Sequence, residues 1–401
     1  MASSLQKSLI GRARIFLLSG ATTGSKSGVS LRYKGEPVQE VIVPTPLFVC
    51  RLASSPLESH FSFRNNLKVI VVAIVCAPSV RPPASGLCAF SPPVKMLLIQ
   101  PTEEMSKQIQ VGLNENPATR DKDLEAIKEW LTKQPHLPQF DDDQVIMTFL
   151  RGCNFSLERC KKKLDMYFTM RAALPELFSN RDIARPVMQD VLKVVHVPVL
   201  PGLTKEGNRV ILMRGIHKDL PTPNVSEAMK LVLMIGDVRL KEESHGVAGD
   251  VYILDAEVAT PTHFAKFPPT LVKKFLVCVQ EAYPAKLKQV HVINISPFVD
   301  TIHNFVKPFL KEKIRNRIFM HSNINTLYEY IPKEILPSEY GGDAGPINVI
   351  HDKWIKKLEE YQPWFTEQEN VKANETLRPD KPKTHDDLFG LDGSFRQLTI
   401  D

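Results

Sequence analysis

Short apolar runs alternate with longer helical patterns between residues 187 and 295, and this alternation limits the fold more than any other feature of the chain. Expected strands cover residues 209–213, 251–254 and 290–295, and expected helices cover residues 225–240 and 270–282. Strands separated by helices are typical of a sheet with parallel strands and helical cover. The sequence therefore predicts an α/β fold with a mainly parallel sheet.

The segment before this alternation, residues 119–178, has a helical pattern. Leu124, Ile127 and Leu131 share one face, and Asp141 and Ser156 precede two further apolar patterns as candidate N-caps. We expect three short helices that form a small lobe. The three lysines at 161–163 are interpreted as a solvated helix face and not as a binding site.

A strongly amphipathic helix is expected at residues 298–310, directly after the last strand. Its apolar residues recur at the spacing of one helix face: Phe298, Val299, Ile302, Phe305, Val306, Phe309 and Leu310. A cluster of cations follows at once, namely Lys311, Lys313, Arg315 and Arg317. This combination predicts an apolar cargo that is handled at an anionic surface.

The surplus of positive charge lies in the first 95 residues. They hold 11 Lys and Arg against 3 Asp and Glu, which leaves 40 basic and 42 acidic residues for 96–401. The extension lacks the basic pattern interleaved with aromatics and the zinc-ligand spacing that accompany nucleic-acid binding, so we expect no nucleic-acid partner. The six cysteines form no C-x-x-C pair, and we expect a reduced compartment, a monomer, no metal and no cofactor.

Residues 1–95 are rich in Ser, Gly and Pro and read as a poorly ordered extension. Met96 opens a segment that resembles an ordinary protein start, so the extension is interpreted as non-native or disordered. The alternative is mitochondrial targeting by residues 1–35, which contain six cations and no carboxylate. The longest uncharged apolar run, 69–77, is far shorter than the roughly 20 residues that span a bilayer, so we expect a cytoplasmic protein, peripheral at membranes.

Local signatures of common enzyme sites are missing from the sequence. It contains no G-x-G-x-x-G, G-x-x-x-x-G-K-[ST], G-x-S-x-G or H-E-x-x-H pattern. Asp255 and Glu257 follow a strand, with His263 nearby, which leaves a lipid-modifying enzyme as an alternative. Structural hydrogen bonding in a loop is the favoured interpretation of these residues, and we expect no enzyme.

Four segments carry a resemblance to a known family: FLRGCNFSLERCKKKLDMYFTMR, DVYILDAEV, EAYPAKLKQVHVINISPFVDTIHNFVKPFLKEKIRNRIFMHS and LPSEYGG. Together they resemble the CRAL-TRIO lipid-transfer family, including its tocopherol- and retinaldehyde-binding members, over residues 121–342. The ending, DDLFGLDGSFRQLTID, is similar to that of insect members. The resemblance implies a sheet that floors a hydrophobic cavity, preceded by a helical lobe and closed by a mobile gate.

The resemblance also assigns roles to residues. The gate is expected at Phe298, Ile302, Phe305, Phe309 and Leu310. Cavity-lining positions are Met229, Val232, Leu233, Gly236, Leu254, Phe275, Val279, Tyr283, Ile302, Phe305 and Val306. Phosphoinositide-binding positions are Lys286, Lys288, Lys313 and Arg317. Val232 and Gly236 stand where the tocopherol-binding member has hydroxyl side chains, so the implied ligand stays open among tocopherol-, retinoid- and phospholipid-like molecules.

Four segments are therefore expected: an extension at 1–95, a helical lobe at 96–185, a CRAL-TRIO lipid-binding domain at 186–345, and a C-terminal segment and tail at 346–401. Within the last, residues 376–387 are too polar to be expected to pack, whereas residues 388–400 regain apolar character and are expected to dock. The expected activity is transfer of one hydrophobic ligand between membranes that contain phosphatidylinositol bisphosphate. The alternative outside enzymology is a phosphoinositide-reading adaptor with a vestigial cavity.

Overall fold

The computed structural model describes residues 97–217, 219, 221–295 and 298–390, and the backbone of two short antiparallel strands, β1 (Arg32–Tyr33) and β2 (Glu36–Pro37). The chain divides into two compact units, Met1–Leu87 and Cys88–Asp401. The second unit contains the main sheet. Apart from β1 and β2, the predicted extension and its targeting segment lie outside the described residues, as do residues 391–401 of the tail.

The main sheet has six strands and is mainly parallel, as predicted. Its bounds are β3 (Val195–His196), β4 (Val199–Leu203), β5 (Asn208–Gly215), β6 (Gly249–Asp255), β7 (Leu287–Ile293) and β8 (Ile318–Met320). Strands β5, β6, β7 and β8 pair in parallel in that order, with Val210 beside Val251 and Ile253 beside His291. Strands β3 and β4 both pair antiparallel with β5.

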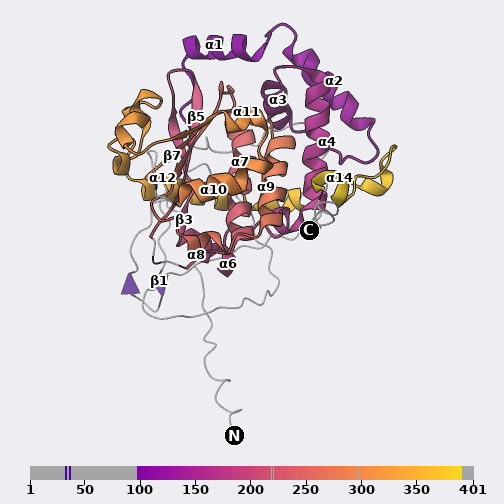
Figure 1. The fold of residues 1–401 in the computed structure, drawn as a ribbon. Helices are drawn as coiled ribbons and strands as arrows, with labels where there is room; N and C mark the ends of the chain where they lie inside the picture. Colours follow the sequence, from indigo (N-terminus) through magenta and orange to yellow (C-terminus); the bar gives the residue numbers. More distant parts are fainter. Residues whose placement is uncertain are drawn as a thin grey trace, which may run out of the picture. The chain divides into compact units, whose positions relative to one another are not determined.

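Three helices connect the parallel strands and position the candidate site. They are α7 (Val225–Glu242), α9 (Pro269–Glu281) and α10 (Val299–Val306), and Figure 1 shows them between the strands and the helices α2 and α4. The side chain of Asn224 caps α7 by accepting a hydrogen bond from the Glu227 amide. The four-residue helix α8 (Pro261–Phe264) precedes α9.

The predicted helix at 298–310 is too long. Helix α10 ends at Val306 and is followed by a 3₁₀ turn, η1 (Lys307–Phe309). The reason is Pro308, which has no amide hydrogen to donate and whose ring would collide with the carbonyl four residues earlier. The gate is therefore a two-turn helix with a tighter turn at its end.

The helices before residue 186 form the lobe, and the last helix before the sheet packs on the sheet core through Met188 and Val191. Their bounds are α1 (Glu103–Leu113), α2 (Arg120–Thr132), α3 (Asp143–Gly152), α4 (Leu157–Ala173), α5 (Pro175–Phe178) and α6 (Pro186–Leu192). Asp142, not the predicted Asp141, caps α3, since its carboxylate accepts from the Val145 amide at 3.1 Å. The buried cluster of the lobe includes Phe149 and Phe168, and it continues into Leu233 of α7 and Cys278 of α9. Lobe and sheet helices thus share one core.

A buried polar network ties the lobe to α7 and α9. Asp237 of α7 accepts hydrogen bonds from the hydroxyls of Tyr167 at 3.1 Å and Tyr283 at 2.7 Å. It also pairs with the guanidinium groups of Arg171 at 2.8 Å and Arg181 at 2.7 Å. All five side chains are buried. A buried charge without partners costs several kcal/mol, so this carboxylate fixes where its partners must lie.

The C-terminal segment returns across the molecule after the sheet. Its helices are α12 (Ile347–Glu360), α13 (Gln362–Glu367) and α14 (His385–Phe389), with 3₁₀ turns η5 (Gln368–Asn370) and η6 (Glu375–Leu377). The short helix α11 (Glu312–Arg315) precedes β8, and the 3₁₀ turns between β8 and the C-terminal segment are η2 (Ile324–Glu329), η3 (Lys333–Ile335) and η4 (Ser338–Tyr340). Trp354 of α12 is fully buried, and its indole nitrogen donates to the Val199 carbonyl at 2.8 Å. Helix α12 is thereby fastened to the antiparallel side of the sheet.

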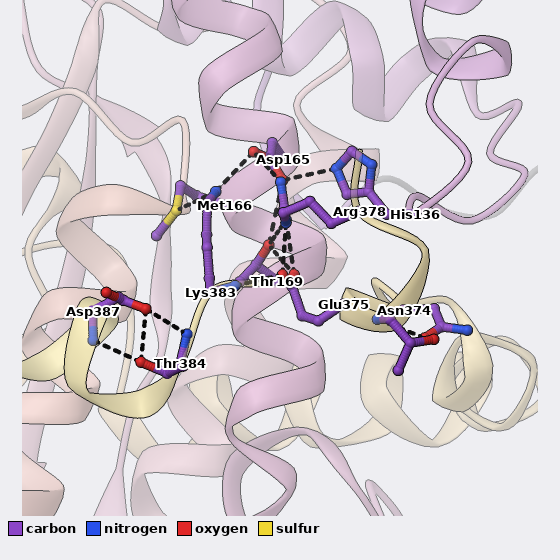
Figure 2. A network of polar contacts seen from close by, with 11 residues as sticks. His136, Asp165, Met166, Thr169, Asn374, Glu375, Arg378, Lys383, Thr384 and Asp387 are labelled. Atoms are coloured by element: carbon purple, nitrogen blue, oxygen red, sulfur yellow. Dashed lines mark hydrogen bonds and ion pairs between the residues drawn. The ribbon is translucent and has the colours of Figure 1, made fainter. Parts of the chain in front are cut away.

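Residues 376–387, expected to be too polar to pack, are held on α4 by ionic contacts. Figure 2 shows Asp165 of α4 with Arg378, at 2.7 and 3.1 Å, and Lys383, at 2.8 Å. Although burial opposes ionisation, hydrogen bonds from these two cations lower the pKa of Asp165 to about 2. Phe389 is then buried against the lobe cluster, so the part of the expected docking segment that is described, 388–390, lies on the body.

Candidate functional site

A cavity of about 120 Å³ lies between α7, α9, the end of α3 and the first residues of β6. Helix α7 contributes Val232, Leu233 and Gly236, and α9 with the residues after it contributes Val279 and Tyr283. These are five of the eleven residues expected to line a ligand cavity. The same lining also contains charged residues, so the cavity is apolar only in part; they are Arg151, Arg239, Glu243, Asp250 and Lys286.

The other six expected residues do not line this cavity. Met229 and Phe275 pack against the buried cluster of the lobe, and Leu254 packs against a small cluster around Ala256, Val292 and Val299. Ile302, Phe305 and Val306 lie on or beside the gate helix and are half-buried. Their role in ligand contact stays a prediction.

Tyr283 and Gly236 define one wall of the cavity. The Tyr283 hydroxyl is bound to Asp237, which holds its ring in place against Tyr167 at 5.6 Å between centroids. A Cβ atom at Gly236 would lie 3.5 Å from the Tyr283 ring, an ordinary contact distance. Glycine inside a helix is less favourable than alanine by roughly 1 kcal/mol, and here it leaves the space in front of the ring open.

The gate helix α10 is only partly covered. Val299 is its one buried residue, whereas Phe298, Ile302, Phe305, Phe309 and Leu310 are half-buried. Phe264 of α8 contacts the rings of Phe298 and Phe305, with centroids 5.6 and 4.9 Å apart, and Phe305 contacts Phe309 at 5.8 Å. Edge-to-face aromatic contacts thus hold the middle of the gate.

The C-terminal end of the gate is held by hydrogen bonds instead. The Gln280 side chain of α9 donates to the Phe309 carbonyl at 3.0 Å and accepts from the Lys311 amide at 3.0 Å. Lys311 also forms an ion pair with Glu281 at 2.6 Å. These contacts, which we call the Gln280 clamp, anchor one end of the gate to α9.

The four expected phosphoinositide-binding residues lie around the starts of β7 and β8. Lys286 and Lys288 flank the first residue of β7, Lys313 lies in α11, and Arg317 directly precedes β8. Lys288 and Lys313 are exposed, whereas the Arg317 guanidinium donates to the Leu287 carbonyl and is half-buried. Whether they bind a headgroup stays a prediction.

The lowered pKa of Lys286 indicates that several cations lie close to its ammonium group. Burial, followed by the charges of Lys288, Arg159 and Lys313, lowers its pKa to about 8. Its ammonium group donates to the Asn154 side chain and has no carboxylate partner among the described residues. Arg159 of α4 therefore belongs to this cationic cluster, although the sequence places it 127 residues before Lys286 and offers no local signal for it.

The sequence predicts that the lysines at 161–163 form a solvated helix face, and for Lys163 this prediction is wrong. The Lys163 ammonium group donates to the carbonyls of Gln280 at 2.7 Å and Tyr283 at 2.8 Å. It satisfies carbonyl groups at the end of α9 that have no partner within the helix. Burial accordingly lowers the pKa of Lys163. Lys163 thus connects the lobe to the helix that carries the Gln280 clamp.

The candidate catalytic residues make contacts around the end of β6. Asp255 accepts hydrogen bonds from the Glu257 amide and Asn294 at 3.0 Å each and from the Tyr340 hydroxyl at 2.6 Å. The His263 ring contacts the Val258 carbonyl at 3.0 Å. These contacts organise the loop after β6, which agrees with the structural interpretation of Asp255.

Substitutions at Gly236 test the cavity wall. We expect Gly236→Ala to stabilise the fold by about 0.5–1 kcal/mol, because alanine favours the helix and its Cβ atom fits. We expect Gly236→Leu to fill the cavity and to reduce the amount of co-purified lipid, measured by native mass spectrometry. Gly112→Leu in α1, where a side chain meets nothing within 4 Å, is the matched control. An unchanged lipid content in Gly236→Leu would contradict this location of the cavity.

Two family models match the chain. One described as "Pinta-like, UBA domain" matches residues 116–188, and one described as "CRAL/TRIO domain" matches residues 195–342. The solved structure titled "Crystal structure of Sfh5" is similar over 63% of this chain and 93% of its own, with a TM-score of 0.37 and 14% sequence identity.

Curated relatives are similar over most of their length. "Alpha-tocopherol transfer protein-like" from Mus musculus is 32% identical over 250 residues, which cover 62% of this chain and 72% of the relative. The Homo sapiens protein of the same name is 31% identical over 249 residues, with the same coverage. "Clavesin-2" from Rattus norvegicus is 26% identical over 261 residues, which cover 65% and 79%. The chain therefore belongs to the CRAL/TRIO domain family of lipid-binding and transfer proteins.

Proposed function

We propose that this chain binds one hydrophobic molecule behind α10 and carries it between membranes, where it docks on phosphoinositides. The observation that carries the proposal is the half-buried apolar face of α10, with the cationic cluster beside its anchored end. The apolar face can enter a bilayer while the cations meet its headgroups. Such a protein is cytoplasmic and binds membranes peripherally. It transfers its ligand and does not catalyse a reaction.

The free-energy cost of opening the gate is small enough to be met at a membrane. Full exposure of five large apolar side chains would cost roughly 7–15 kcal/mol as an upper bound. Because these side chains are partly exposed already, the free-energy cost of opening is somewhat below that bound. Contact with the acyl boundary of a bilayer removes most of this cost. Opening is thereby rare in water and accessible at the membrane.

The cationic cluster supplies reversible docking. Each Lys or Arg near an anionic leaflet contributes about 1 kcal/mol, so Lys286, Lys288, Lys313 and Arg317 contribute roughly 4 kcal/mol together. Among the helices of the described ranges, none is long and apolar enough to cross a membrane. Docking of this strength allows the protein to leave after each exchange.

The names of the relatives suggest the kind of cargo. Two of them are called alpha-tocopherol transfer protein-like, and a tocopherol-like, retinoid-like or phospholipid-like ligand fits the apolar wall formed by Val232, Gly236 and Val279. Val232 and Gly236 have no hydroxyl group, which argues against tocopherol itself as the ligand. The polar group of such a ligand would need a different hydrogen-bond partner.

Charge reversal tests docking. We expect Lys288→Glu with Lys313→Glu to slow transfer to vesicles that contain phosphatidylinositol bisphosphate at least tenfold, because two attractive charges become repulsive. Both side chains are exposed, so the fold should be unaffected. Transfer of a fluorescent lipid between vesicles measures the rate.

The matched control reverses Lys353 and Lys356, which are exposed on α12 and change the net charge equally. It should transfer lipid like the unsubstituted protein. An unchanged rate in the Lys288 and Lys313 variant would sink the docking part of the proposal, and an equal loss with neutral vesicles would show that charge is not the cause.

The depressed pKa of Lys286 predicts a pH dependence. An anionic headgroup favours the charged form, so binding raises the pKa of Lys286 above its free value of about 8. Binding then takes up protons, and the affinity for these vesicles is complete below pH 8 and falls as the pH rises through 8 and above. Vesicle sedimentation between pH 7 and 10 measures this slope.

Arginine stays charged over this whole range, so Lys286→Arg should bind with no such slope. Lys288→Arg should leave the slope in place, since it keeps Lys286. A slope that survives in Lys286→Arg would assign the pH dependence to another group.

The small volume of the described cavity favours a second candidate. Ligand pockets usually measure about 300–1,000 Å³, and this one measures about 120 Å³. A phosphoinositide-reading adaptor with a vestigial cavity would need no more space. A carrier would need a wider cavity than this one, to whose lining α10 contributes no residue.

Native mass spectrometry of protein purified from its own source separates the two candidates. We expect one lipid molecule per chain, since the carrier fills its cavity before it docks. Protein that is fully active in membrane docking and carries no lipid would favour the adaptor.

A further inference from the structure

Two cysteines meet at the turn between α3 and α4. Cys153 follows α3 directly, and Cys160 lies in the first turn of α4. The chain reverses through two consecutive residues in the left-handed region, Asn154 at φ 54° and Phe155 at φ 52°. Asparagine tolerates this conformation, but a bulky residue such as Phe155 rarely adopts it, so the surrounding structure holds the turn in place. In this turn the Cys160 thiol donates a hydrogen bond to the Cys153 sulfur.

Cations surround the Cys153 thiol. The positive charges of Lys163, Arg159 and Lys286 all act on it. The hydrogen bond from Cys160 lowers the pKa of Cys153, burial opposes this effect, and the three cations lower the pKa further. Cys153 therefore has a larger fraction of thiolate, the nucleophilic form, than an ordinary thiol.

Cys278 of α9 has a different environment, although it belongs to the same apolar cluster. Burial, followed by the charge of Asp237, raises the pKa of Cys278, so this thiol keeps its proton. The hydrogen bond to Cys153, followed by burial, raises the pKa of Cys160 as well. Cys153 is thus the nucleophile of the three, and Cys160 is the thiol next to it. Because only 4% of Cys153 is exposed, a small uncharged reagent suits it best.

We propose that Cys153 and Cys160 are a modification site, which a small hydroperoxide oxidises to a disulfide. The Cys153 sulfur attacks one peroxide oxygen; an S–O bond forms, the O–O bond breaks, and the other oxygen takes up a proton and leaves as water or an alcohol. The Cys160 sulfur then attacks the sulfenic acid on Cys153. An S–S bond forms, the S–O bond breaks, and the hydroxyl group leaves with the thiol proton as water. Both sulfurs are oxidised, and the two peroxide oxygens are reduced.

Oxidation changes the charge next to Lys286. The thiolate form of Cys153 is an anion near this cation, whereas a disulfide is neutral. Lys286 also donates to the side chain of Asn154, which lies in the turn that the disulfide closes. In a reduced compartment such a disulfide is transient and reports on the oxidant. The site thus connects the oxidation state of the lobe to the cationic cluster, whether or not that cluster binds headgroups.

Peptide mapping of the intact protein tests the site. Dilute hydrogen peroxide is added to the reduced protein, the remaining thiols are blocked under denaturing conditions, and a tryptic digest is analysed without reduction. Trypsin cleaves after Arg159, so the disulfide joins peptide 152–159 to peptide 160–161. We expect this linked pair to appear about tenfold faster than any oxidation of Cys278. A pair that stays reduced, or that oxidises no faster than Cys278, would overturn the site.

Two variants separate the roles of the neighbours. In Cys160→Ala we expect the reaction to stop at the sulfenic acid of Cys153, which dimedone traps as an adduct on peptide 152–159. We expect Lys286→Gln to slow the oxidation of Cys153 about threefold, because one cation that favours the thiolate is lost. Lys353→Gln, exposed on α12, is the matched control and should oxidise like the unsubstituted protein.

Equal rates in the Lys286→Gln and Lys353→Gln variants would overturn the role of the cations. The peptide map of the unsubstituted protein depends on neither variant, so it decides the site even if a variant does not fold. Because no readout involves a lipid, a negative result would leave the proposed transfer function standing.

Discussion

Asp237 lies where the helical lobe, α7 and α9 meet, and the arrangement of all three depends on it. Its carboxylate binds Tyr167 and Arg171 of α4, Arg181 of the following loop, and Tyr283 after α9. Two arginines share one buried carboxylate, so loss of the carboxylate would leave both cations unpaired in the core. The same carboxylate also fixes one wall of the cavity. The Tyr283 hydroxyl donates to Asp237, and the Tyr283 ring lines the cavity. The position of this cavity wall thus depends on a polar group behind it.

Helix α9 links this core to the gate. Lys163 of the lobe binds its C-terminal carbonyls, and Gln280 near the same end binds the backbone of residues 309 and 311. The anchored end of the gate is also the end beside the cationic cluster, whereas aromatic contacts with Phe264 hold its middle. In the proposed function, docking would therefore act next to this fixed point, and α10 would move about it. The ionic contacts of Asp165 with Arg378 and Lys383, and the burial of Phe389, place the C-terminal segment over the same lobe and α9.

Periodicity was sufficient for most elements because hydrophobic spacing reports directly on which face of a helix or strand is buried. It located β5, β6 and β7 and the helices α7 and α9 within a few residues. It failed where a local chemical detail decides, as at Pro308, which ends α10 early, and at Asp142, which caps α3 in place of its neighbour. It also failed for residues 376–387, where charged side chains pack by pairing with Asp165. Arg159 and Lys163 could not be assigned from the sequence, since their partners lie more than 100 positions away.

The fold class could be predicted from the sequence, because alternating strands and helices favour a mainly parallel sheet. The apolar helix followed by cations predicts a gate beside a docking surface. These are properties of neighbouring residues, and local spacing encodes them. Only the tertiary structure decided which side chains share the cavity. It brought Val232 and Gly236 together with Val279 and Tyr283, packed Met229 and Phe275 against the core of the lobe, and placed charged side chains such as Arg239 and Asp250 in the same lining. Burial and hydrogen-bond pairing depend on contacts between distant segments, and no spacing along the chain can specify them.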